Sequence, residues 1–199
     1  MAGLDMCWGG SANNGYFMTA SATPVQNDIF QTLRTFLLGL ITTDIIQGLP
    51  NRAAMPAGAF ISMTSLFQTR LSTNVKGYSD TYTTVQGVKV YNGTKSVTQA
   101  TEWTVQLDCY GESSQEWANI ITTLFRDEYA AEAMAPKLQP LYADDPKQMP
   151  IVNGEQQYEQ RWVITAKLQY NPVTVINQQF FDTAVVGIHD VDHETLHNN

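Results

Sequence analysis

The stretch YEQRWVITAKLQY, residues 158–170, alternates apolar and polar side chains more regularly than any other part of the chain. Side chains two residues apart in an extended chain point to the same face. One face therefore carries Trp162, Ile164, Ala166 and Leu168, and the opposite face carries Arg161, Thr165, Lys167 and Gln169. The pattern predicts a β-strand with its apolar face on the hydrophobic core.

Two other long segments have a β-type pattern. Residues 59–71 have apolar side chains at the odd positions Ile61, Met63, Phe67 and Leu71. Residues 97–110 place four apolar side chains on one face, namely Trp103, Val105, Leu107 and Cys109. Both patterns predict strands that contribute one face to the core.

Shorter or less regular segments complete the set of expected strands. Residues 82–91 and 173–188 are rich in β-branched and aromatic residues, and Ile45-Ile46 indicates a short extended piece. Asn92-Gly93 favours a turn between 82–91 and 97–110. We therefore expect a long β-hairpin or meander, with a polar loop from Pro140 to Pro150 before the strand at 158–170.

Two helices are expected from apolar residues at helical spacing. The first runs from Thr23 to about Thr42, where Thr23 is the expected cap, Pro24 fits the first turn and Gln26 can close a capping box. Its apolar face is Val25, Ile29, Leu33, Phe36, Leu37 and Leu40.

The second helix is expected to begin at Ser113 or Ser114, with Glu116 completing a capping box. It continues to about Met134 and ends before Pro136. Its apolar stripe is Trp117, Ile120, Ile121, Leu124 and Phe125.

The order of helix, strands, helix and strands predicts an α+β fold, in which an antiparallel or mixed β-sheet is packed by two main helices. We expect a flexible N-terminal arm at residues 1–21, a single domain at 22–188 and a polar C-terminal tail at 189–199. The arm is rich in Gly and Asn, but its Trp8, Tyr16 and Phe17 could be buried against a partner.

Composition limits the classes of function. The formal net charge is −8, with 19 acidic and 11 basic residues, which argues against tight binding to a phosphate backbone. Charged residues are 15% of the chain against about 25% in average domains, so neighbouring subunits could cover part of the surface. No apolar run reaches the ~18 residues of a membrane span. Cys7 and Cys109 suggest neither a disulfide framework nor a metal site.

Catalytic and cofactor-binding motifs are missing from the sequence, so no enzyme activity, cofactor or metal is expected. The three histidines fall in the C-terminal tail with three acidic residues: His189, Asp190, Asp192, His193, Glu194 and His197. A solvated chain end explains this cluster better than a metal site does. Asp144 and Asp145 are adjacent carboxylates in a loop, where a turn or water is the ordinary partner. Arg161 could form an ion pair with that loop.

Several stretches, in this order, resemble the neck and tail-terminator proteins of tailed phages. They cover residues 25–192 and comprise Ile46-Gln47-Gly48 with Asn51-Arg52 and Pro56, Val105 to Gly111, Leu141 to Pro146, Gln157 to Trp162, Leu168 to Asn171, and Phe181-Asp182. The Gly/Asn-rich leader and the histidine-bearing tail have no counterpart in the resemblance.

The resemblance implies a structural virion protein with a fold similar to other tail terminators. Such a protein forms a homo-oligomer, a sixfold ring, that caps the tail tube and meets the head connector or collar, and in some phages the sheath. DNA passes through the hole without sequence-specific binding. Assembly would take place in the host cytoplasm, and the family contributes no catalytic residues.

Three other functions are alternatives to a terminator. Another neck ring, either a gateway or a head-completion protein, needs the same ring and hole. A carbohydrate-binding virion module would need exposed aromatic side chains, whereas Trp103, Trp117 and Trp162 fall on stripes expected to be buried. An enzyme would have to use Asp144 and Asp145.

Overall fold

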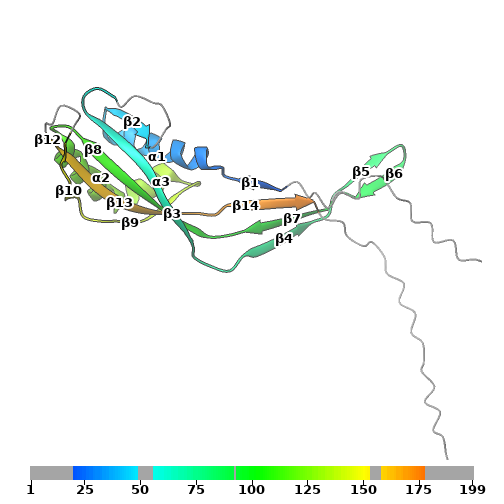
Figure 1. Cartoon of the computed structure of the whole chain (residues 1–199). Coiled ribbons are helices and arrows are strands. Elements are labelled where there is room, and N and C mark those ends of the chain that lie inside the picture. The colour runs from blue at the N-terminus through cyan, green and yellow to red at the C-terminus, as the bar shows by residue number, and fades with distance from the viewer. Residues whose placement is uncertain (1–19, 49–55, 92, 153–157, 178–199) are drawn as a thin grey trace, which may run out of the picture.

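A computed structural model describes residues 20–48, 56–91, 93–152 and 158–177 of the chain. These residues form a body of helices packed on a sheet and a narrow β-extension that projects from one end of the body (Figure 1). The helices in this described part are not long and apolar enough to cross a membrane.

The body is built on a six-stranded mixed sheet. Its strands are β2 (Asp44–Gln47), β3 (Phe60–Arg70), β8 (Thr101–Tyr110), β9 (Gln139–Ala143), β10 (Lys147–Gln148) and β13 (Arg161–Tyr170). The order is β10-β13-β8-β3-β2, and β9 pairs with β13 on the same edge as β10. Only the β2–β3 pair is parallel within this sheet. The α+β class and the mixed sheet predicted from sequence are confirmed.

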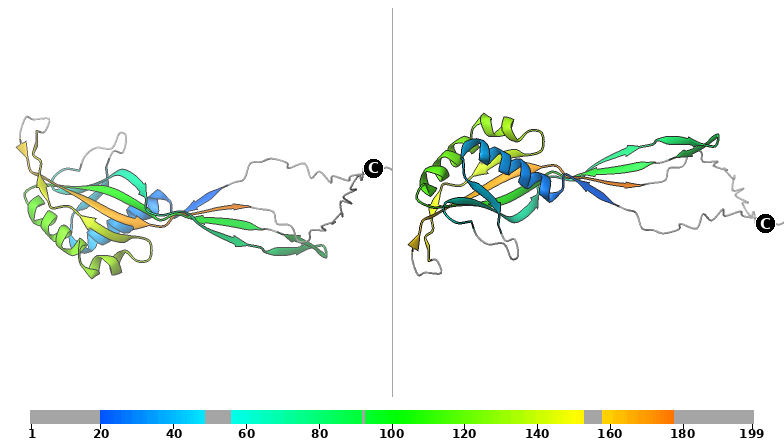
Figure 2. Two further views of the ribbon diagram at one scale, coloured as in Figure 1. Left: turned by 90° about the horizontal axis from the view of Figure 1, so that it is seen from below. Right: turned by 90° about the horizontal axis from the view of Figure 1, so that it is seen from above.

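Three helices cover one face of this sheet (Figure 2): α1 (Gln26–Leu40), α2 (Ser114–Phe125) and α3 (Glu128–Met134). The core lies between them and the sheet. Its largest fully buried side chains include Trp103, Leu107 and Val105 from β8, Ile164 and Leu168 from β13, and Ile29, Leu33 and Leu37 from α1. The apolar faces predicted for residues 97–110 and 158–170 are therefore the faces that form the core.

The extension continues strands of the body. A four-stranded antiparallel sheet follows the order β1-β14-β7-β4, with bounds Ser21–Thr23, Val173–Asn177, Thr94–Thr98 and Val75–Ser79. Beyond it, β5 (Tyr82–Val85) and β6 (Val88–Tyr91) form a two-stranded tip. The path β3-β4-β5 outward and β6-β7-β8 back is the expected long hairpin (Figure 1).

The hairpin reverses direction at a different place from the one predicted. Gln86 and Gly87 have φ angles of 50° and 81°, as a two-residue turn between twisted strands requires. Residues 82–91 therefore form both arms of the tip, not one strand. Asn92 of the predicted Asn92-Gly93 turn lies outside the described residues.

The first helix begins later than expected. Thr23 ends β1 and does not cap the helix, and Val25 occupies the cap position of α1. The Asp28 carboxylate accepts a hydrogen bond from the Val25 N–H at 3.1 Å, which supplies the cap that Gln26 was expected to close. The predicted apolar face is correct in its middle, but Val25 is exposed.

The second predicted helix is two helices. α2 ends at Phe125, and Asp127 begins α3 by accepting a hydrogen bond from the Tyr129 N–H at 3.0 Å. An Asp in this position starts a new helix because its side chain satisfies an N–H that has no partner within the helix. Ser113 occupies the cap position of α2 without a side-chain hydrogen bond, so the expected capping box is absent there.

The predicted loop from Pro140 to Pro150 contains β9 and β10. Both pair with the edge of β13 that faces away from β8, because this pairing satisfies backbone groups that a loop would leave without partners. Pro140 is tolerated because β9 is an edge strand. Of the predicted segment 173–188, the first five residues form the strand β14, and the remainder lies outside the described residues.

Candidate assembly surface

Large apolar side chains lie exposed along the outgoing half of the long hairpin. Six of them are between 45% and 68% exposed: Leu66, Phe67, Leu71, Val75, Tyr78 and Tyr82. Solvent exposure of this extent along a projecting element is typical of a surface that a partner covers. We call these six residues the apolar strip.

A β-bulge in β3 places the first part of the strip outside the core. Ser65 pairs with Val105 on the helix-covered face, and the next registered pair joins Phe67 to Thr104 on the opposite face. The extra residue reverses the alternation, so Phe67 does not continue the face of Ile61 as the sequence pattern had indicated. Trp103 donates its indole N–H to the Ser65 hydroxyl at 2.9 Å beside this bulge.

The four-stranded sheet of the extension has two chemically distinct faces. Register places Ser21, Thr23, Val75, Ser79, Ser96, Thr98, Val173 and Val175 on one face, which we call the hydroxyl face. The other, the lysine face, carries Ala22, Lys76, Tyr78, Lys95, Val97, Thr174 and Ile176. Every residue of these four strands is exposed or half-buried, so the sheet has no core of its own.

Charge is distributed unevenly between the extension and the rest of the chain. β1, β4, β7 and β14 contain Lys76 and Lys95 but neither Asp nor Glu, although the chain as a whole has a net charge of −8. The Lys95 ammonium lies 5.9 Å from the centre of the Tyr78 ring. The extension is thus a locally basic element of an acidic protein.

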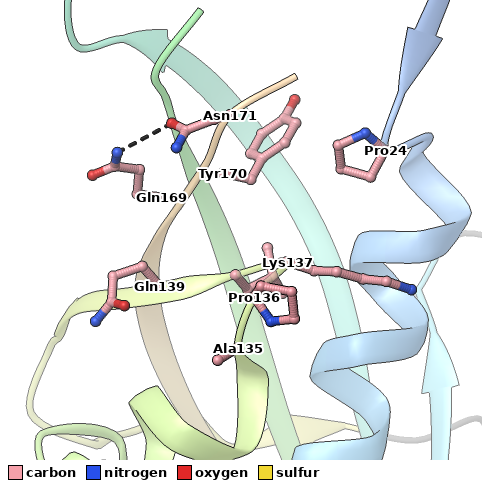
Figure 3. Close-up of a pocket in the computed structure, with 9 residues that line it drawn as sticks. Pro24, Ala135, Pro136, Lys137, Gln139, Gln169, Tyr170 and Asn171 are labelled. Atoms are coloured by element: carbon pink, nitrogen blue, oxygen red, sulfur yellow. Dashed lines mark hydrogen bonds between the residues drawn. The ribbon is translucent and has the colours of Figure 1, made fainter. Parts of the chain in front are cut away.

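A cavity of about 470 Å³ lies where the extension meets the body. Its lining comes from three places: Pro24 before α1, the end of β13 with Asn171 after it, and the segment from Ala135 to Leu138 with the first residue of β9. Figure 3 shows the hydrogen bond of 3.1 Å between the Gln169 and Asn171 side chains. This lining contains no carboxylate, imidazole or thiol among the described residues, and its titratable side chains are Lys137 and Tyr170.

A buried ion pair lies on the sheet face that the helices do not cover. Arg161 of β13 donates to Asp108 Oδ1 from Nε at 3.1 Å and from Nη2 at 2.8 Å, and Gln106 donates to both carboxylate oxygens. The Arg161 guanidinium lies over the Tyr110 ring. Burial, with the Asp108 carboxylate adding to it, raises the pKa of the Tyr110 hydroxyl. The sequence suggested that Arg161 pairs with the acidic loop. Arg161 instead pairs with Asp108 on the neighbouring strand β8.

The acidic loop has a different basic partner. Arg126, at the end of α2, donates to Asp145 Oδ1 at 2.9 Å and to the Ala143 carbonyl oxygen at 2.7 Å. Lys147 lies 3.9 Å from Asp144. The Asp145 side chain is 85% exposed, so its ion pair with Arg126 holds the loop at the surface.

The three tryptophans among the described residues pack in or against the core. Trp103 is fully buried, and Trp117 and Trp162 are half-buried against the core, so these three do not make an exposed sugar-binding platform. Within the described ranges no group of three or more His, Cys, Asp or Glu side chains could hold a metal ion. The histidine-bearing tail and Cys7 lie outside these ranges. Cys109 is buried in β8.

The sequence did not identify Asp108 as the partner of Arg161, or Arg126 as the partner of Asp145. The position of Asp108 within a predicted strand was a usable signal, because a carboxylate that is buried on a central strand needs a partner. Arg126 gave none, since its partners lie 17 and 19 residues away in the chain. The exposure of Phe67 also had no signal, because the bulge is set by pairing with β8.

Comparison with known proteins gives one family. No curated protein sequence matched the chain. The sequence model of a family described as phage neck terminator protein matches residues 27–193, a range that includes the strands of the body and all strands of the extension except β1. The span agrees with the resemblance noted over residues 25–192. The chain belongs to the phage neck terminator protein family and is a structural protein of the virion neck.

Proposed function

We propose that this protein forms a closed ring at the neck, ends the growth of the tail tube and joins the tail to the head while DNA passes through its centre. The family match over most of the chain carries this proposal. The elongated subunit supports it, because the body and the extension offer separate surfaces for neighbours around the ring and for partners along the axis (Figure 1).

A ring needs two different faces on each subunit that meet after a fixed rotation. The outgoing half of the hairpin provides one candidate surface, since the six exposed apolar side chains of the apolar strip, which lie on both of its faces, are costly to leave in water. We infer that the extension lies across the neighbouring copy or along the axis. The family resemblance implies six copies, tail tube and sheath proteins on one side, and the head connector or collar on the other.

The charge distribution is compatible with passage of DNA. A net charge of −8 prevents strong adhesion of the phosphate backbone to the protein as a whole. Residues 1–21 and 189–199 flank the domain, and we propose that they act as an arm and a tail around it. Assembly of the ring would take place in the host cytoplasm, before the tail joins the head.

Electron microscopy of particles from a phage that lacks the gene tests this function. A terminator predicts tails that are longer than normal, variable in length and free of heads. Tails of normal length beside heads that lose their DNA would instead identify a gateway or head-completion ring. Complementation with the wild-type gene should restore uniform, joined tails and is the control.

A further inference from the structure

The four-stranded sheet of the extension has two open edges. Its order places β1 at one edge and β4 at the other, and neither pairs with a further strand within the described residues. All three residues of β1 and four of the five in β4 are exposed. An exposed edge of a sheet offers backbone N–H and C=O groups with which another strand can pair.

The polarity of the two edges is complementary. All three pairings in the sheet are antiparallel, so β1 and β7 run one way and β14 and β4 run the other. When copies are related by rotation about an axis roughly along the strands, β4 of one copy lies antiparallel to β1 of the next. The alternation of strand direction then continues from copy to copy without a break.

The usual protection of an edge strand is weak here. Edge strands avoid association through short length, proline, bulges and charged side chains, and of these only short length applies to β1. Neither β1 nor β4 contains proline, their registers show no bulge, and Lys76 is the only charged residue on either strand. Val75 and Tyr78 of β4 are also more than half exposed. An isolated sheet without a core and with two open edges gains most from closure, because closure removes both edges.

We propose that β4 of each copy pairs with β1 of the next, so that the extensions join into one closed antiparallel β-barrel around the ring axis. The proposal rests on the ring proposed above and specifies the second copy of this chain as the partner of both edges. Backbone hydrogen bonds set the contact, and the side chains of the lysine face and of the hydroxyl face lie on opposite walls of the barrel.

Disulfide cross-linking in assembled tails tests this pairing. Ala22→Cys on β1 is combined with Lys76→Cys or with Tyr78→Cys on β4, all three on the lysine face. Within one chain β1 and β4 are separated by three strand spacings, ~14 Å, which exceeds the ~7 Å that a disulfide spans. Every disulfide between these positions therefore joins two copies.

The control pairs Ala22→Cys with Val75→Cys or Ser79→Cys, which lie on the hydroxyl face of the same strand. All variants carry Cys7→Ser. The remaining native thiol, Cys109, is fully buried. After oxidation, at least one lysine-face pair should give a ladder of covalent oligomers ending at the size of the ring. The two control pairs should give about tenfold less covalent oligomer, because Ala22 and its control partner lie on opposite faces and their side chains point away from each other.

Uniform tails that carry rings but give no ladder with either lysine-face pair would overturn the barrel and leave the proposed function intact. Equal amounts of covalent oligomer from the lysine-face pairs and the control pairs would also overturn the barrel. A second measurement covers variants that fail to assemble. Amide hydrogen exchange of the wild-type chain should slow at least tenfold in residues 21–23 and 75–79 on assembly, and unchanged exchange there would contradict the pairing. Failure of the proposed function would be seen separately: the phage that lacks the gene would then make normal tails.

Discussion

Asp108 and Arg161 face each other across β8 and β13, joined by two hydrogen bonds of 3.1 and 2.8 Å to one carboxylate oxygen. The Asp108 side chain is only 5% exposed, and that of Arg161 is 21% exposed. Gln106 donates to both oxygens of the same carboxylate, so the charge is almost fully satisfied. This cluster fixes the register of the two long strands on the face that the helices leave uncovered.

Removing the carboxylate should destabilise the body strongly. Asp108→Ala leaves Arg161 without its partner in a largely buried place, which costs about 3 kcal/mol of unfolding free energy. Urea unfolding followed by fluorescence measures the change. Asp145→Ala is the matched control, since it removes an exposed ion pair with Arg126 and should cost less than about 1 kcal/mol. Equal losses for the two variants would show that the cluster contributes nothing beyond a surface pair.

Substitution by alanine should destabilise two glycines with positive φ to different extents. Gly111 has φ 107°, and a Cβ there would lie 2.6 Å from the Ala59 Cβ; Gly58 has φ 93° and open space. Gly58→Ala should therefore cost only the backbone strain, about 1 kcal/mol, whereas Gly111→Ala should cost at least about 2 kcal/mol. Thermal unfolding of both variants gives the comparison. A Gly111→Ala protein as stable as Gly58→Ala would contradict the close approach.

Alkaline pH should destabilise the fold through Cys109. Burial, and secondarily the adjacent Asp108, raises the pKa of the Cys109 thiol from 9.0 to about 12. Between these values the unfolded chain releases the thiol proton and the folded chain keeps it, so stability is full below pH 9 and falls as pH rises towards 12. One such group contributes a slope of up to about 1.4 kcal/mol per pH unit.

Urea unfolding at several pH values from 8 to 11 measures this slope. Cys109→Ala should be less stable at pH 8 by about 1 kcal/mol, with a shallower loss at higher pH. Cys7→Ser keeps Cys109 and should keep the wild-type slope. Tyr110 and Tyr170 also have raised pKa values, mainly through burial, so part of the alkaline loss should remain in both variants. Identical slopes for all three proteins would refute the role of the thiol.

Shortening the tip should separate folding from assembly. Replacing residues 80–93 by a two-residue turn removes β5 and β6, which form the end of the extension that lies away from the body (Figure 1). The variant should unfold within about 0.5 kcal/mol of the wild type, yet fail to produce uniform tails in the phage. Gln86→Asn keeps the turn, because Asn tolerates positive φ, and should assemble normally. Normal tails from the shortened variant would exclude a contact by the tip.

The sequence predicted the strands of the core well because their alternation is local. β8 and β13 each place four apolar side chains at two-residue spacing, and all four in β8 are fully buried. The start of a new helix after Phe125 depends on a single hydrogen bond that the Asp127 carboxylate accepts from the Tyr129 N–H, and the spacing of apolar residues gave no sign of it. The prolines of 140–150 suggested a loop, although an edge strand tolerates them.

The surface was less accessible to sequence reasoning than the core. The place of the turn was misassigned because Asn92-Gly93 has the stronger turn chemistry, whereas pairing of β5 with β6 selects Gln86-Gly87. The bulge beside Ser65 and the partner of Arg161 both arise from contacts with β8, far away in the sequence. Family resemblance, and not periodicity, indicated the neck function.

A map of the neck in intact virions, at a resolution that traces the chain, tests the central claim most directly. The account predicts a closed ring of copies of this chain between the last ring of the tail tube and the head connector, with the extensions surrounding the DNA channel. A chain found as single copies, or in a position that leaves the end of the tube uncovered, would contradict it.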